Sequence, residues 1–210
     1  MKKKDIIQQE NSHLHVVDPE YVKLVSQISD LWEVAKTKAA TAGQTVSGRN
    51  YCLWEVAKPK AATAINTELL DANWKTGQYI VEFEQGGNTK AKYGDKLLVN
   101  LSKDLIRIKG RGFSRSVLNY MRKFYLAFPK CATVSHKLTW SHYIELLKCD
   151  DPMEMQFYMQ ECIKERWKVR ELRRQINSSL FQRLALSTDK EGVLALANQG
   201  HQVLTPEDII

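Results

Sequence analysis

The residues best suited to chemistry in this 210-residue sequence are basic, and they are concentrated in one stretch. Residues 90–130 contain eleven lysines and arginines but only two acidic residues, a net charge of +9 in a chain whose formal net charge is +7. Concentrated positive charge is the electrostatic signature of a surface that binds a polyanion such as DNA. Solvated lysines on an ordinary soluble protein would give a similar overall balance, so the argument depends on how these residues are arranged.

A helix-turn-helix pattern lies within the basic stretch. Apolar residues at helical spacing predict a helix over residues 96–108, and a second helix follows Ser114, which is a favoured N-cap residue. The turn between them contains Gly110 and Gly112, either of which can adopt the positive φ that a tight turn requires. Two helices joined by a short glycine-containing turn are typical of this motif.

The second helix of the pattern divides into two faces. Its apolar side chains predict an inward stripe that fixes the helix to the one before it: Val117, Met121, Phe124 and Phe128. Its polar side chains lie on the opposite side: Arg115, Asn119, Arg122 and Lys123. In a DNA major groove, arginine can form two hydrogen bonds with guanine and asparagine can form two with adenine, while lysine and serine contact phosphates. An ordinary surface helix with a solvated basic face is the alternative.

These patterns define the candidate DNA-binding residues. Those in and before the second helix are predicted to contact the groove and its backbone: Arg111, Ser114, Arg115, Ser116, Asn119, Arg122 and Lys123. A later basic helix over residues 168–176 is predicted to supply further phosphate contacts: Lys168, Arg170 and Arg174. We expect no catalytic residue, metal site or cofactor.

The elements around these residues are almost all helical. Asp18-Pro19-Glu20 predicts the start of one helix, and a second helix is expected over residues 61–84. The second helix is expected to turn five residues inward: Ile65, Leu69, Trp74, Ile80 and Phe83. Further helices are predicted over 138–147 and 153–163. The fold class is therefore all-α, with room for a small β-wing and with a long N-terminal helical extension.

An internal duplication stands out. Residues 31–42 recur as residues 53–64 with eleven of twelve positions identical. Two nearly identical copies indicate a local duplication rather than a solenoid, which needs about three units. The predicted organisation is a disordered segment over 1–17, N-terminal helices over 18–89, a helix-turn-helix region over 90–186 and a linker helix within 187–210.

Other candidate sites are weaker. The four cysteines form no CxxC pair, which fits a reducing cytoplasm and argues against a zinc ribbon. His13 and His15 fit a disordered pair better than a metal site. His142 could touch phosphate but fits a capping or surface role better. The start of the chain has no apolar segment typical of a secretory signal, and no stretch is long enough to span a membrane.

Several longer motifs resemble a known family. The run through Gly112–Ser116, Leu138–His142 and Trp167–Leu172 has a local similarity to the helix-turn-helix region of ParB-type DNA-binding proteins. Most of the chain, from about Tyr21 to Ile210, resembles the N-terminal domain of the bacterial YhcG family. This resemblance rests on four motifs: Gly77–Gly87, Gly112–Ser116 with Met121–Tyr125, Leu138–Tyr143 and Trp167–Leu172. The resemblance implies a helical, winged-helix-like domain that precedes a PD-(D/E)XK nuclease domain.

The sequence departs from the nuclease part of that family. A PD-(D/E)XK site needs carboxylates to hold Mg²⁺ and a lysine two positions after one of them, but none of the 24 acidic residues is followed by lysine at that spacing. We therefore expect a non-enzymatic module that positions a nuclease domain, absent from this sequence, on duplex or branched DNA. A homodimer is compatible with this reading. A protein-interaction or oligomerisation domain without DNA contact is the alternative.

Overall fold

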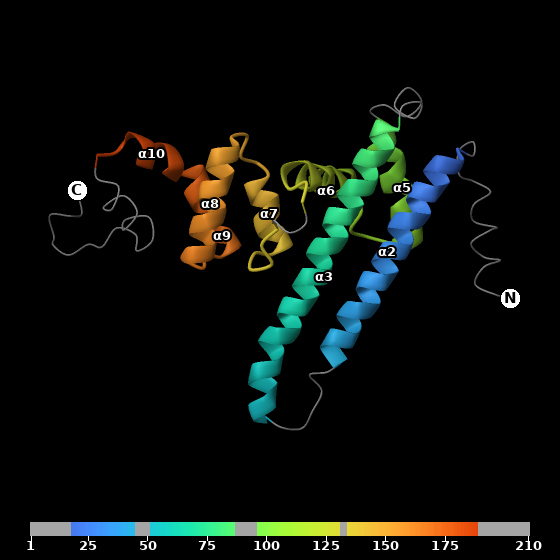
Figure 1. Ribbon diagram of the computed structural model, residues 1–210, viewed down its shortest axis with the longest axis horizontal. Coiled ribbons are helices and arrows are strands. Elements are labelled where there is room, and N and C mark those ends of the chain that lie inside the picture. The colour runs from blue at the N-terminus through green and yellow to red at the C-terminus, as the bar shows by residue number, and fades with distance from the viewer. Residues whose placement is uncertain (1–17, 45–50, 87–95, 131–133, 189–210) are drawn as a thin grey trace. The chain divides into compact units, whose positions relative to one another are not determined.

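A computed structural model describes residues 18–44, 51–86, 96–130 and 134–188 (Figure 1). Within these ranges the fold is all-α, as predicted, and no strand of a β-wing is found there. The chain divides into two compact units, residues 1–136 and 137–210, and each is described by itself. The predicted helix-turn-helix region, residues 90–186, contributes helices to both units.

The first unit is built on a long antiparallel hairpin of helices α2 (Pro19–Gln44) and α3 (Tyr51–Gln85) (Figure 1). Helix α2 starts as predicted, because the Oδ1 atom of Asp18 accepts a hydrogen bond of 3.1 Å from the backbone N–H of Glu20. The first copy of the duplicated segment lies in α2. The second copy lies in α3, which begins ten residues earlier than the predicted 61.

Two of the residues expected inside the hairpin are on its surface. The exposed fractions of Ile65 and Leu69 are 40% and 36%, whereas Ile80 further along the same face of α3 is fully buried. Helical periodicity identifies the face that turns inward, but it does not say where the covering helices end. The prediction that Ile65 and Leu69 belong to the core was therefore wrong.

Helices α5 (Leu97–Lys109) and α6 (Arg115–Ala127) pack against the hairpin. Leu101 and Leu105 of α5 and Leu118 and Phe124 of α6 are fully buried. The helix predicted over residues 96–108 is thus confirmed to within a residue, although Ile108 near its end is 41% exposed. The core of the unit is formed by all four helices, and each buried leucine or phenylalanine contributes about 1.5–3 kcal/mol of transfer free energy.

The apolar side of α6 rests mainly on α3 and only secondarily on α5. Met121, Phe124 and Phe128 are buried as predicted, and Val117 is partly buried. The expected packing of α6 on the helix before it is thus present, but packing on α3, a helix of the N-terminal extension, is more extensive. Gly77 of α3 explains the close approach, because a Cβ atom there would lie 2.0 Å from the carbonyl oxygen of Met121.

Within its described residues, 137–188, the second unit contains four shorter helices: α7 (Trp140–Leu146), α8 (Pro152–Lys164), α9 (Val169–Asn177) and α10 (Leu180–Leu186) (Figure 1). The side chain of Asp151 caps α8 by accepting a 2.9 Å hydrogen bond from the backbone N–H of Met153. The centre of the unit is formed by fully buried residues from all four helices: Tyr143, Leu146, Tyr158, Leu172 and Leu180.

Helix α10 was not predicted. It follows Ser179, which adopts a left-handed conformation with φ of +52°. The hydroxyl of Tyr158 accepts a hydrogen bond from the N–H of Phe181 and donates one to the carbonyl of Gln175, both 3.2 Å long, so it joins α10 to α9. The predicted linker helix within residues 187–210 lies outside the described residues except for Ser187 and Thr188, and the predicted disordered segment 1–17 lies outside them altogether.

Candidate nucleic-acid interface

The turn before α6 has the conformation that its glycines suggested. Gly110 has φ of +84° and Gly112 has φ of +118°, values that side-chain-bearing residues rarely adopt. Ser114 then caps α6, because its hydroxyl oxygen accepts a hydrogen bond of 3.3 Å from the backbone N–H of Val117. The predicted N-cap and turn are confirmed, and they fix the angle at which α6 begins.

A chain of contacts anchors this turn to the hairpin. The ring of Phe113 is buried and meets the indole of Trp32 edge-on, with ring centroids 5.2 Å apart. The indole N–H of Trp32 in turn donates a 3.1 Å hydrogen bond to the hydroxyl of Thr76 on α3. The first residues of α6 are therefore held by both helices of the hairpin.

The outward face of α6 carries the predicted polar residues. Arg115, Ser116 and Lys123 are exposed, and Asn119 is partly exposed. Arg111 in the preceding turn is also exposed. No carboxylate of the described residues forms an ion pair with Arg111, Arg115 or Lys123, so these three cations remain available to an external anion.

Arg122 has a different environment from the other basic residues of α6. Its Nε atom donates a 2.7 Å hydrogen bond to the Oε2 atom of Glu84 near the end of α3. The side chains of Arg122 and Glu84 are 34% and 28% exposed. Arg122 is thus a paired, half-buried arginine rather than the free surface cation that its place in the pattern suggested.

Acidic residues from elsewhere in the chain reduce the positive charge of the basic stretch. Lys109 pairs with Glu33 of α2 at 2.7 Å, and Arg122 pairs with Glu84 of α3 at the same distance. Within the stretch, Arg107 lies 3.8 Å from Asp104, one of its own two acidic residues. The hydroxyl of Tyr21 also donates a 2.7 Å hydrogen bond to Asp104. Because Glu33 and Glu84 lie outside the stretch, the +9 counted along the sequence overstates the charge that the folded surface presents.

The remaining candidates lie in the second unit. Lys168 and Arg170 are exposed at the start of α9. The guanidinium of Arg174 donates hydrogen bonds of 2.6 and 3.2 Å to Glu171, and these bonds lower the pKa of the Glu171 carboxyl. Of the three residues predicted here, Arg174 is already engaged in an ion pair. All three belong to the second unit, whereas α6 belongs to the first.

A buried carboxylate fixes α9 to α7. Glu145 is 4% exposed and receives 2.7 Å hydrogen bonds from both Lys148 and Arg173. Desolvation alone would raise the pKa of Glu145, but the hydrogen bonds and the two positive charges outweigh it and lower the pKa. Arg173 is consequently a structural residue of the second unit.

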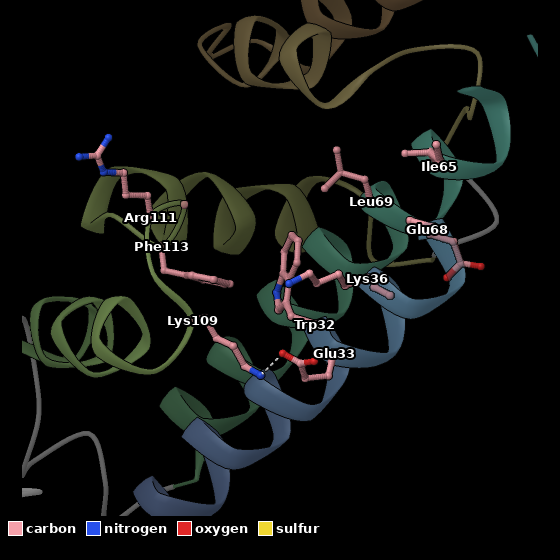
Figure 2. Close-up of a pocket in the computed structure, with 12 residues that line it drawn as sticks. Trp32, Glu33, Lys36, Ile65, Glu68, Leu69, Lys109, Arg111 and Phe113 are labelled. Atoms are coloured by element: carbon pink, nitrogen blue, oxygen red, sulfur yellow. Dashed lines mark hydrogen bonds and ion pairs between the residues drawn. The ribbon is translucent and has the colours of Figure 1, made fainter. Parts of the chain in front are cut away.

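An open apolar groove of about 380 Å³ lies beside the turn before α6 (Figure 2). Ile65 and Leu69 of α3 contribute to it together with Trp32 and Phe113, and the ring of Phe113 points toward Trp32. The rim carries charges of both signs: Glu33, Lys36, Glu68, Lys109 and Arg111. The guanidinium of Arg111 points away from Trp32 and Phe113 (Figure 2), and Arg111 is exposed.

The other groups considered for chemistry have structural roles. His142 belongs to a capping box, in which its Nδ1 atom accepts a 3.2 Å hydrogen bond from the backbone N–H of Thr139. Its Nε2 atom lies 3.1 Å from the carbonyl oxygen of Trp167. Burial raises the pKa of Cys149 and of Cys162 to about 11, so neither thiol is an activated nucleophile. The described residues hold no cluster of three metal-binding side chains, and His13 and His15 lie outside them.

Sequence reasoning missed two residues that shape this surface. Gly77 lies inside a long helical pattern, where a glycine lowers helix stability relative to alanine. A glycine at such a position suggests that close packing requires it, and this was the sequence feature that could have identified Gly77. Glu84 belongs to the same motif, residues 77–87, but nothing local indicated that it would reach Arg122. Among the helices of the described residues, none is long and apolar enough to cross a membrane.

Comparisons with known proteins identify the family. Residues 53–183 match the DUF1016 N-terminal domain. The chain is 32% identical over 178 residues to a protein of Escherichia coli strain K12 named "Putative nuclease YhcG", and the match covers 70% of this chain. It covers 48% of the relative, so the chain spans about half the length of the curated protein it matches. No solved structure matches. The chain therefore belongs to the family of the DUF1016 N-terminal domain, in agreement with the resemblance seen in its motifs.

Proposed function

We propose that this chain is a DNA-binding module that positions a C-terminal PD-(D/E)XK nuclease domain on DNA and does not itself cleave. The observation that carries the proposal is the outward face of α6. There Arg111, Arg115 and Lys123 are exposed beside a capped helix start, with no carboxylate pairing them among the described residues. A basic helix face that is supported from behind suits insertion into a groove between phosphate backbones.

The name of the relative supports the nucleic-acid part of the proposal. The protein of E. coli carries the name "Putative nuclease YhcG", and this chain matches about half of its length. A module that binds DNA would increase the effective concentration of a linked nuclease domain at its substrate. Such a role belongs in the bacterial cytoplasm, where the DNA is.

Binding to a 20-base-pair duplex, followed by fluorescence anisotropy between 50 and 200 mM salt, tests the proposal. Each phosphate that a cation contacts contributes about 0.9 to the slope of log affinity against log salt. The double variant R115Q/K123Q should therefore reduce the slope by roughly 2. The variant K23Q/K60Q removes the same charge from exposed lysines of α2 and α3 and should leave the slope nearly unchanged.

Three further measurements complete the test. Single-stranded and branched probes of equal length establish which form of DNA is preferred. Incubation of duplex DNA with the chain and Mg²⁺ should give no cleavage, and metal-dependent cleavage would contradict the proposed lack of catalysis. Absence of salt-dependent binding to all three probes would contradict the DNA-binding role itself.

The groove beside Phe113 favours a second candidate, a protein-interaction or self-association domain. Ile65 and Leu69 expose apolar surface there, which soluble monomers rarely leave in large patches. The rim carries both signs of charge, so it selects no particular occupant. Salt-insensitive self-association that L69D abolishes, together with no duplex binding, would support this candidate over the first.

A further inference from the structure

We infer that Glu84 positions Arg122 to read a guanine in the major groove of a duplex, an inference that rests on the proposed DNA-binding function. Glu84 lies in α3, outside the helix-turn-helix pattern, and its carboxylate is the hydrogen-bond partner of Arg122. The substrate class is then duplex DNA with a guanine at one defined position, rather than any polyanion.

The position of Arg122 on α6 fits this role. Arg115, Asn119 and Arg122 follow one another at i, i+4 and i+7, so they lie along the same side of the helix. Arg122 stands at the edge of that side next to α3, and it keeps 34% of its side chain exposed despite its ion pair. It is therefore accessible from the face that the proposed function directs toward DNA.

The atom that Arg122 uses in the ion pair is equally informative. Glu84 is contacted by Nε, on the inner edge of the guanidinium. No other hydrogen bond from Arg122 is found among the described residues, so both Nη atoms keep their donors. The end of the guanidinium is the part that pairs with O6 and N7 of guanine through two parallel hydrogen bonds.

A carboxylate behind the arginine also lowers the cost of recognition. A free arginine loses substantial rotamer entropy when it is immobilised at a base edge. Arg122 is already held by Glu84, so less freedom remains to be lost on binding. Arg115 and Lys123 have no such support, and their mobility suits contact with phosphates, which requires charge rather than fixed geometry.

The same ion pair could act only as a clamp between α3 and α6. In that case its loss would destabilise the unit and weaken binding to all sequences alike. A positioning role, in contrast, predicts a change of base preference at one position. Base preference is therefore the readout that separates the two roles.

The experiment is a binding selection on a duplex library with a random 12-base-pair core, followed by sequencing. The wild-type chain should enrich guanine at one position. R122Q should lower the guanine preference by on the order of 10-fold, which is the discrimination expected of a bidentate contact. The slope of log affinity against log salt should change less in R122Q than in R115Q/K123Q. E84Q keeps Arg122 but removes the carboxylate that orients it, so it should lower the guanine preference at the same base position.

Three controls keep the result interpretable if a variant folds poorly. Circular dichroism reports helicity and thermal midpoint for each variant, and R122K preserves the charge without the planar fork. The charge-swapped variant E84R/R122E rebuilds an ion pair between α3 and α6. It should recover the thermal midpoint that single variants lose but not the guanine preference.

The outcomes distinguish this inference from the proposed function. No salt-dependent duplex binding by the wild type would overturn both. Salt-dependent binding with no enriched guanine, or with a guanine preference that survives R122Q and E84Q, would overturn the positioning role alone. Recovery of the preference in E84R/R122E would also overturn it, because a clamp would then be sufficient.

Discussion

Gly77 of α3 lies so close to Met121 of α6 that the two helices have no space for a side chain between them. A Cβ atom at Gly77 would be 2.0 Å from the carbonyl oxygen of Met121 and 3.0 Å from the Cβ of Tyr125. The nearest atom belongs to the backbone of a helix, which cannot move as a flexible side chain can. The absence of a side chain at Gly77 thus sets the distance between α6 and its support.

We expect G77A to destabilise the first unit, although alanine is intrinsically the better helix former by about 1 kcal/mol. Overpacking against backbone should cost about 1–3 kcal/mol and displace α6. Urea denaturation followed by circular dichroism measures the change. K75A, an exposed substitution two residues away, provides the control and should remain near wild type. Stabilisation of the G77A variant would show that α6 is not held at this distance in solution.

Phe113 should contribute strongly to stability through its contact with Trp32. Removal of a buried phenylalanine typically costs about 3–5 kcal/mol, so F113A should lower the thermal midpoint markedly. I106A removes an apolar side chain that is 42% exposed on the neighbouring helix and should have a much smaller effect. Equal effects of the two variants would mean that Phe113 does not anchor the turn before α6.

His142 should make the second unit less stable in mild acid. Desolvation lowers the pKa of His142 in the folded state, partly offset by its hydrogen bond to the carbonyl of Trp167. The unfolded chain, with a histidine pKa of about 6.5, therefore binds the proton more readily. The stabilisation is complete above about pH 6.5 and is lost as the pH falls toward the folded pKa.

Glutamine suits the same capping position without titrating, so H142Q should show a flatter dependence of unfolding free energy on pH between 7.5 and 5.5. The difference between the two proteins isolates His142 from other titrating groups. The native pKa of His142 can be measured directly by NMR. A value at or above 6.5 would contradict the predicted direction.

The thiols of Cys149 and Cys162 should react slowly in the folded protein. Burial is the main cause of their raised pKa of about 11, and for Cys149 the nearby charges of Glu154 and Asp150 add to it. At pH 8 the reactive thiolate is then on the order of 100-fold scarcer than for an ordinary thiol. In a C52S/C131S background, iodoacetamide should label these two residues slowly in buffer and rapidly in urea. Rapid labelling without urea would show that they are accessible thiolates.

The sequence predicted α6 well because the information needed was local. The cap, the two glycines and both faces of the helix lie within twenty residues, and periodicity alone separates Met121 and Phe124 from Arg115 and Lys123. Helix starts marked by a cap, as at Asp18 and Asp151, were also predictable. These features depend on residues that are close together in the sequence, so they can be predicted without knowledge of the tertiary structure.

Features that depend on distant partners were not predictable. Glu84 and Arg122 are 38 positions apart, and nothing along the chain links them. Ile65 and Leu69 share a face with Ile80, yet only Ile80 is fully buried. Helix α10 has seven residues and follows a left-handed serine, which no propensity rule favours as a helix start.

The duplicated segment has a consequence for how the chain tolerates changes of length. Trp32 meets Thr76, and Lys38 meets Glu68 at 3.4 Å, so the first copy faces the part of α3 that follows the second copy. At the closed end of the hairpin α3 extends past α2 (Figure 1). The 22-residue offset between the copies includes the connection between the two helices, so the copies run in opposite directions on the two arms of the hairpin rather than along one helix. The closed end of the hairpin is thus a suitable point for inserting a tag, remote in sequence from the turn and helix that would touch DNA.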